Sequence, residues 1–170
     1  MECCRLKIGE GTRIFEPVTF VHKDGVNIGK NCSIGQFCFI GTRNLILEDE
    51  VEICPQVTIS GGDRVYVEEK ATVCYGARII PSTMDKKFKY MNDLVRSKNP
   101  SLSNVINGSI TIGKGAYIGS NAVICISEKC PSIRIGDFAV IGALSYVDRS
   151  VLSHTIVHPK NDNVVNDREI

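Results

Sequence analysis

Histidines are the side chains best suited to proton transfer near neutral pH, and this sequence has three: His22, His154 and His158. Three converging imidazoles would also suffice for a catalytic zinc site. His22 lies near one end of the chain, whereas the other two lie near the opposite end. The long irregular stretch 84–108 contains no histidine, so a site built on that stretch lacks an imidazole base.

The sequence has eight cysteines, but a disulfide framework is typical of shorter, secreted chains. We therefore expect free thiols. Cys125 and Cys130 have the spacing of half a metal site, yet no second pair of ligands is evident. A solvent-facing turn is the favoured interpretation of this pair.

Charge is balanced along the chain, with 20 Lys and Arg against 19 Asp and Glu and a formal net charge of +1. Such a balance gives no electrostatic footprint for nucleic acid or for an anionic membrane. No apolar run approaches the roughly 18 to 20 residues that a membrane span needs. The first residues also lack the apolar core of a secretory signal, so we expect a cytoplasmic protein with small-molecule partners.

The elements that position these residues are predicted by the aliphatic side chains. The 170 residues include 21 Ile and 17 Val but only 7 Leu, a bias that favours strands over helices. Eight of the 15 glycines directly follow an isoleucine, and the aliphatic residues recur every six positions. The repeated aliphatics are Ile28, Ile34, Ile40, Leu47, Ile53, Ile59, Val67, Val73, Ile79, Ile112, Ile118, Ile124, Ile135, Ile141 and Val147.

A six-residue repeat of this kind predicts a triangular coil of short parallel strands. The aliphatic residue points inward, and so does the mostly small residue four positions later, such as Cys32, Cys38, Asn44, Asp63 or Thr83. Glycine after the aliphatic lets the backbone turn where a Cβ would crowd the corner. Three repeats make one turn, so fifteen repeats predict about five turns in a single domain, 1–170.

Two segments depart from the repeat. The stretch 84–108 is longer than ordinary connections, and its aromatic and aliphatic residues predict an ordered external loop that packs on a neighbour and roofs a site. Beyond Val151 the repeat fades into a polar C-terminal tail, about 153–170.

Three stretches carry a resemblance to a known family. EPVTF at 16–20 with VNIGKN at 26–31, and IGKGAYIGSNAVI at 112–124, are similar to the galactoside and maltose acetyltransferases. STMDKKFKYMN at 82–92 resembles a motif of acyltransferases that decorate surface polysaccharides. The chain thus resembles the hexapeptide-repeat acyltransferases, and the resemblance implies an all-β, left-handed parallel β-helix, although most crossover connections are right-handed.

The resemblance also implies a function. Such proteins are homotrimers that bind acetyl-CoA as co-substrate in the groove between two prisms, where the acceptor attacks the thioester directly. We therefore expect an acetyltransferase that acts on a sugar or nucleotide sugar, for example in lipopolysaccharide biosynthesis. The protein's task is then alignment, oxyanion stabilisation and proton removal.

Catalytic candidates follow from matching positions. His22 lies on a segment whose counterpart helps to form the acceptor end of the site, although a surface imidazole is the commoner situation. Asp85 matches an acidic position of the loop motif, and a solvated carboxylate among lysines is its alternative. Glu52 stands where several relatives have histidine, but a carboxylate is a weak base for an alcohol. Tyr90 either stacks on the sugar or anchors the loop.

Cofactor contacts are expected at Ser120, Ala143, Arg149 beside Asp148, and Lys160. The family's usual end of this groove, Val-x-Gly-Asn-Pro-Ala-Lys, reads VHPK here at 157–160. His158 is thus more suited to contact CoA than to act as a catalyst. His154 falls at a position that is normally occupied by exposed polar residues in the family.

The absence of histidine from the loop favours an amine acceptor. A hydroxyl depends on a base, whereas an amine with a pKa near 8 is partly neutral at pH 7. Two alternatives remain. One is the γ-class carbonic anhydrase, which needs three converging histidines and is disfavoured by their distribution; the other is a non-catalytic β-helix used as a scaffold or an assembly subunit.

Overall fold

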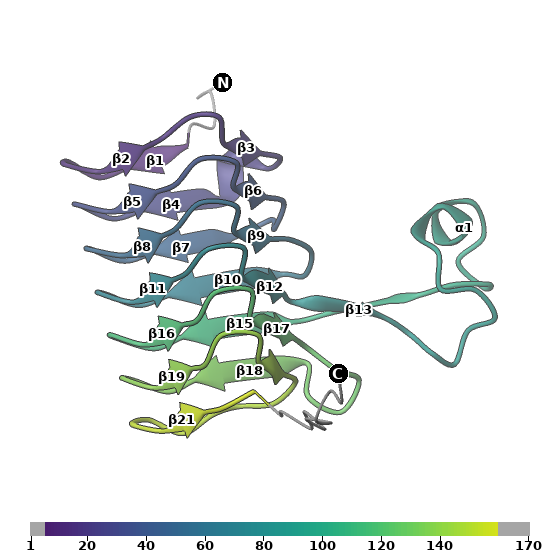
Figure 1. Ribbon diagram of the computed structural model, residues 1–170. Coiled ribbons are helices and arrows are strands. Elements are labelled where there is room, and N and C mark those ends of the chain that lie inside the picture. The colour runs from purple at the N-terminus through teal and green to yellow at the C-terminus, as the bar shows by residue number, and fades with distance from the viewer. Residues whose placement is uncertain (1–5, 160–170) are drawn as a thin grey trace, which may run out of the picture.

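The computed structural model describes residues 6–159 and has the predicted architecture, a left-handed parallel β-helix (Figure 1). Three parallel sheets form the sides of a triangular prism, and successive strands along the chain move from sheet A to sheet B to sheet C. The sheets contain six, seven and six strands, so the coil completes six turns and begins a seventh. The first turn was absent from the predicted count, although Ile8, Ile14 and Phe20 are also six residues apart.

Sheet A comprises β1 (Lys7–Ile8), β4 (Val26–Ile28), β7 (Leu45–Leu47), β10 (Arg64–Val67), β15 (Ser109–Ile112) and β18 (Ser132–Ile135). Sheet B comprises β2 (Arg13–Ile14), β5 (Ser33–Ile34), β8 (Glu52–Ile53), β11 (Thr72–Val73), β16 (Tyr117–Ile118), β19 (Val140–Ile141) and β21 (Ile156–Val157). Sheet C comprises β3 (Thr19–Phe20), β6 (Phe39–Ile40), β9 (Thr58–Ile59), β12 (Arg78–Ile80), β17 (Val123–Cys125) and β20 (Tyr146–Val147). Because β21 continues sheet B, the coil extends past residue 153, where the sequence suggested that the tail begins.

The interior of the prism is a continuous column of aliphatic side chains. All fifteen repeated aliphatics are at most 4% exposed, and Cys32 and Cys38 are buried beside them as predicted. Strands in successive turns lie roughly 4.8 Å apart, so each inward side chain stacks on its equivalents above and below.

The prediction of inward-facing partners is wrong at the edge where sheet C leads into sheet A. Asn44 and Asp63 are exposed and Thr83 is only half-buried, whereas Leu45 and Val65 are fully buried. The connections at this edge are longer than in the other two corners, so the first inward residue of sheet A comes one or two positions later. This edge, which we call the C–A edge, is therefore the place where insertions are accommodated.

The glycines act differently from the prediction. At Gly29 the backbone is not in the left-handed region, but a Cβ there would lie 2.6 Å from the carbonyl carbon of Glu48 in the next turn. The left-handed residue comes two positions later, at Asn31, with φ of 53°. Glycine after the aliphatic therefore allows close stacking of turns, and the corner itself accepts other side chains.

Candidate active site

The long insertion is an ordered arm that projects from the C–A edge (Figure 1). Its root is an antiparallel pair, β13 (Ser82–Met84) with β14 (Val105–Asn107), and its tip carries the short helix α1 (Asp93–Lys98). The side chain of Asn92 caps this helix, because its Oδ1 accepts hydrogen bonds from the N–H groups of Leu94 (2.9 Å) and Val95 (3.2 Å). The arm divides the C–A edge into two clefts.

The first cleft lies between the arm and the N-terminal turns and has a volume of about 460 Å³. Its lining comes from the corners of three successive turns, from the arm root and from α1. These residues are His22, Gly41, Arg43, Gly61, Gly62, Ser82, Thr83, Met84, Asp93, Arg96, Val105 and Asn107. His22 precedes a single 3₁₀ turn, Lys23–Gly25, and its side chain is exposed. The structure therefore brings His22 and the root of the arm together in one cleft.

The second cleft lies on the other side of the arm and has a volume of about 290 Å³. It is lined by Thr83, Lys86, Cys125, Ile126, Ser127, Glu128, Lys129, Tyr146 and Asp148. Glu128 Oε1 accepts a hydrogen bond from the backbone N–H of Lys86 (3.0 Å), which ties the arm to the turn 125–131. The predicted turn between Cys125 and Cys130 is present: Ser127 and Cys130 pair with each other, and both cysteines are half-buried free thiols.

The surroundings of Cys125 and of the largely exposed Tyr146 make ionisation of their thiol and phenol groups less favourable. Desolvation, reinforced by the nearby Asp148 carboxylate, raises the pKa of the Cys125 thiol. Desolvation also raises the pKa of Tyr146, with smaller contributions from Cys125 and Asp148. Both groups are therefore neutral hydrogen-bonding groups at neutral pH.

Asp85 and Tyr90 lie in the arm and line neither cleft of the single chain. Asp85 Oδ1 accepts a hydrogen bond from the N–H of Lys87 (3.0 Å), and Oδ2 accepts one from Asn104 Nδ2 (3.5 Å). The Tyr90 ring is 41% exposed and carries the Lys89 ammonium 5.2 Å from its centroid. Both residues thus support the arm and still have free polar or aromatic surface.

Glu52 lies elsewhere, on the outer surface of sheet B. It borders a depression of about 340 Å³ with Phe15, Cys54 and Tyr75, near the edge where sheet B leads into sheet C. We call this the B–C edge. Within one chain, the structure does not bring Glu52 together with His22 and Asp85.

The expected cofactor residues also lie on two edges. Ser120 and Ala143 occupy the B–C edge in successive turns, where the Ser120 carbonyl accepts a hydrogen bond from Leu144 N–H (3.0 Å). Arg149 lies on the C–A edge, 80% exposed, with Nε 3.0 Å from Asp148 Oδ1. Strand β20 separates the two groups. Lys160 lies outside the described residues.

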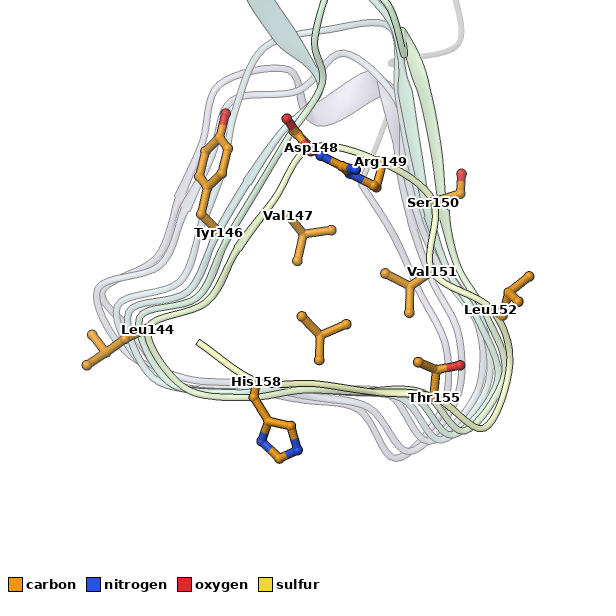
Figure 2. A pocket seen from close by; sticks show the side chains of 11 residues that line it. Leu144, Tyr146, Val147, Asp148, Arg149, Ser150, Val151, Leu152, Thr155 and His158 are labelled. Atoms are coloured by element: carbon orange, nitrogen blue, oxygen red, sulfur yellow. The ribbon is translucent and has the colours of Figure 1, made fainter. Parts of the chain in front are cut away.

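A further cavity, of about 650 Å³, lies at the C-terminal mouth of the prism. Figure 2 looks into it and shows Val147 and Val151 pointing inward, with Leu144 and Leu152 pointing away. His158 also points outward at this end (Figure 2). The lining is a cross-section of the core, so we do not assign the active site to this cavity.

The remaining histidine, His154, is a corner residue. Its ring stacks on Phe138 with centroids 5.3 Å apart, and its backbone φ is 57°. Within residues 6–159, no group of three or more metal-ligating side chains is assembled. His22 follows β3 in the first turn, whereas His154 and His158 lie in the last turn, so the three histidines do not converge as the alternative carbonic anhydrase site would require.

Arg43 and Arg96 are cleft residues that the sequence analysis missed. A count by turns instead of by hexapeptides would have found Arg43, because the corners after β3 and β6 place it one turn from His22. No sequence signal placed Arg96 there, since its position depends on how the arm folds over the edge.

Comparisons with known proteins bear on the identity of the chain. No family model matches it. It is 27% identical over 152 residues to a dTDP-4-amino-4,6-dideoxy-D-glucose acyltransferase of Escherichia coli, covering 88% of this chain and 75% of the relative. It is 26% identical over 144 residues to an E. coli galactoside O-acetyltransferase, covering 85% of this chain but only 55% of that protein. The chain is similar to the hexapeptide-repeat acyltransferases.

The fold supports this similarity. The structure of AntD, an N-acyltransferase from Bacillus cereus in complex with dTDP and 3-hydroxybutyryl-CoA, matches with a TM-score of 0.79 and 20% identity. The match covers 90% of this chain and 78% of AntD. Two predictions are thereby confirmed. The sequence motifs indicated a resemblance to the hexapeptide-repeat acyltransferases, and the interrupted repeat predicted a prism with an external arm. No helix among the described residues is long and apolar enough to cross a membrane.

Proposed function

We propose that this protein transfers an acyl group, acetyl in the first instance, from CoA to the amine of a nucleotide-linked amino sugar. The observation that carries the proposal is the match of 88% of the chain to a dTDP-amino-sugar acyltransferase. The likeness in fold to AntD, which was captured with dTDP and an acyl-CoA, is consistent with it.

The reaction needs little from the protein beyond alignment. The neutral amine attacks the thioester carbonyl, a C–N bond forms, the C–S bond breaks, and the proton lost by the amine balances the thiolate of CoA. With a pKa near 8, about a tenth of the amine is already neutral at pH 7. The arm contains no histidine, so an amine is a better acceptor here than a hydroxyl.

We propose that Asp85 orients the acceptor amine or receives its proton, and that Tyr90 packs against the sugar. Each Asp85 oxygen has one hydrogen bond within the arm, which leaves lone pairs for a substrate N–H. His22 and Glu52 are second candidates for proton transfer, at the first cleft and on sheet B respectively.

The site is completed, in this proposal, by a homotrimer. The expected CoA contacts Ser120 and Ala143 lie on the B–C edge, whereas Arg149 lies on the C–A edge, so two prisms are needed to line one groove. The B–C edge also exposes apolar surface, with Phe37 63%, Tyr75 58% and Leu144 73% exposed. Such a strip is suited to burial between chains. We further propose that the protein is cytoplasmic and serves surface-polysaccharide biosynthesis, with Lys160 as an additional CoA contact.

The proposal is tested by calorimetric titration with acetyl-CoA, followed by mass spectrometry of products from a panel of nucleotide amino sugars and their hydroxyl analogues. We expect an amide product and a rate that rises with pH as the amine becomes neutral. Failure to bind acetyl-CoA at millimolar concentration would refute an acyltransferase and favour the scaffold alternative. Arg149→Ala should weaken CoA more than the acceptor, whereas Arg13→Ala, on the outer surface of sheet B, serves as the control.

A further inference from the structure

The first cleft contains an excess of positive charge. Three basic side chains line it, His22, Arg43 and Arg96, whereas Asp93 is its one carboxylate among the described lining residues. His22 and Arg43 come from successive turns, so their corners lie roughly 4.8 Å apart. Arg96 reaches the cleft from α1 on the arm. The basic groups thus face the same space from two walls.

The two guanidinium groups are available to a ligand. Among residues 6–159, no ion pair or side-chain hydrogen bond involves Arg43. Arg96 uses its Nε to contact Asp93 Oδ1 (2.7 Å), which holds the planar group in place, and its terminal nitrogens have no such contact within the described chain. Arginine binds phosphate through two parallel N–H donors, so a pair of arginines on facing walls suits a diphosphate.

The walls of the cleft are packed against each other. Gly61 and Gly62 both have left-handed backbones, and a Cβ at Gly62 would lie 2.0 Å from the carbonyl oxygen of Pro81. A Cβ at Gly61 would lie 2.1 Å from Ser82 Oγ. Bare glycines thus let the first strand of the arm pack directly onto the prism edge. This packing fixes the root of the arm, and the cleft between arm and prism is preformed.

We propose that the first cleft binds the diphosphate of the nucleotide-linked acceptor, with Arg43 and Arg96 as the binding residues and His22 in support. This inference rests on the proposed function and names the part of the acceptor that this side of the arm recognises. The cleft, at about 460 Å³, falls in the size range of small-molecule sites. CoA also carries a diphosphate, but its expected contact Arg149 follows Asp148, which lines the second cleft, on the opposite side of the arm. The arm then separates the two substrates.

Isothermal titration of the full-length protein with thymidine diphosphate, thymidine and CoA tests the assignment. Arg43→Gln and Arg96→Gln should each weaken thymidine diphosphate about tenfold, because each removes a charge-assisted hydrogen bond. Neither should change the affinity for CoA. Arg13→Gln, an exposed arginine on sheet B, is the matched control and should change neither affinity.

The variant Asp93→Asn tests whether Arg96 binds thymidine diphosphate directly or only shapes the arm through its pair with Asp93. It removes the competing negative charge, so we expect thymidine diphosphate to bind a few times more tightly; weaker binding would mean that the Asp93–Arg96 pair only shapes the arm. Unchanged affinity for thymidine diphosphate in both arginine variants would overturn the proposal, and so would a selective loss of CoA affinity, which would assign the cleft to the CoA diphosphate.

The outcomes also separate this inference from the proposed function. Arginine-dependent binding of thymidine diphosphate without any acyl transfer would support the cleft and refute the reaction. Acyl transfer to amino sugars that carry no nucleotide, with no measurable affinity for thymidine diphosphate, would support the reaction and refute the cleft.

Discussion

Replacement of Gly29 by alanine tests whether the glycines serve the stacking of turns or the turning of the backbone. The φ of Gly29 is outside the left-handed region, so on conformational grounds alone alanine should stabilise the protein by about 0.4–1 kcal/mol. The added Cβ, however, would lie 2.6 Å from the Glu48 carbonyl carbon and 2.7 Å from its oxygen. Both atoms are backbone of the next turn and cannot move aside alone.

Relief of this contact requires the two turns to separate by about 1 Å, since carbon atoms pack at about 3.5–4.0 Å. That movement opposes the hydrogen bond from Gly29 N–H to the Leu47 carbonyl (2.8 Å). Overpacking costs about 1–3 kcal/mol and a weakened hydrogen bond about 1 kcal/mol. After subtraction of the conformational gain, we expect a net loss of about 2 kcal/mol, or roughly 4–8 °C in melting temperature for a chain of this size.

The assay is thermal unfolding followed by far-ultraviolet circular dichroism, with Gly76→Asn as the matched variant. Gly76 has a φ of 66°, but the equivalent corners are held by Asn31 and Asn121, at 53° and 56°. A Cβ at Gly76 would meet only the side chain of Asn121, which can move. We expect a change below about 1 kcal/mol. A Gly29→Ala protein that melts at or above the unmodified protein, beside a strongly destabilised Gly76→Asn, would refute the stacking argument.

Three other predictions concern the proposed chemistry and the thiols. Asp85→Asn keeps an acceptor for the Lys87 N–H but loses the negative charge. We expect kcat to fall at least tenfold with little change in melting temperature. An unchanged kcat would leave Asp85 with a structural role only. Glu52→Gln should change kcat less than twofold if proton transfer occurs at the arm, and a large loss in steady-state assays would move the base to sheet B. Burial raises the pKa of Cys54 to about 11, so at pH 8 only about one in a thousand of these thiols is ionised. Alkylation followed by mass spectrometry should therefore label Cys54 after unfolding but not before. Rapid labelling of Cys54 in the native protein would contradict its burial.

Most of the prism was predictable because its signal is local and repeated. Each inward aliphatic at six-residue spacing contributes the same information, so an error at one position is corrected by its neighbours. The errors lie where the repeat changes length. At the C–A edge, extra residues moved the inward position from Asn44 and Asp63 to Leu45 and Val65, which a strict count of six does not anticipate.

The candidate site was less predictable. The arm was expected at 84–108, and the structure shows its paired root beginning at Ser82. Asp85 and Tyr90 were selected from a motif, and their position in the arm still leaves their roles to experiment. Arg43 and Arg96 were missed because neither belongs to a motif, and only the folded edge places them in one cleft.

The sequence by itself determined the architecture: a β-helix of stacked turns, an insertion that interrupts the repeat at 84–108, and an arm without histidine. These properties depend on residue types and spacing along the chain, which short parallel strands translate directly into inward and outward positions. Only the tertiary structure decided which side chains share a cleft, because coiling places residues about twenty positions apart side by side and folds the arm across them. It also placed Ser120 on the B–C edge, Arg149 on the C–A edge and Glu52 on the outer surface of sheet B. The side or edge on which a residue lies depends on the summed lengths of all preceding corners.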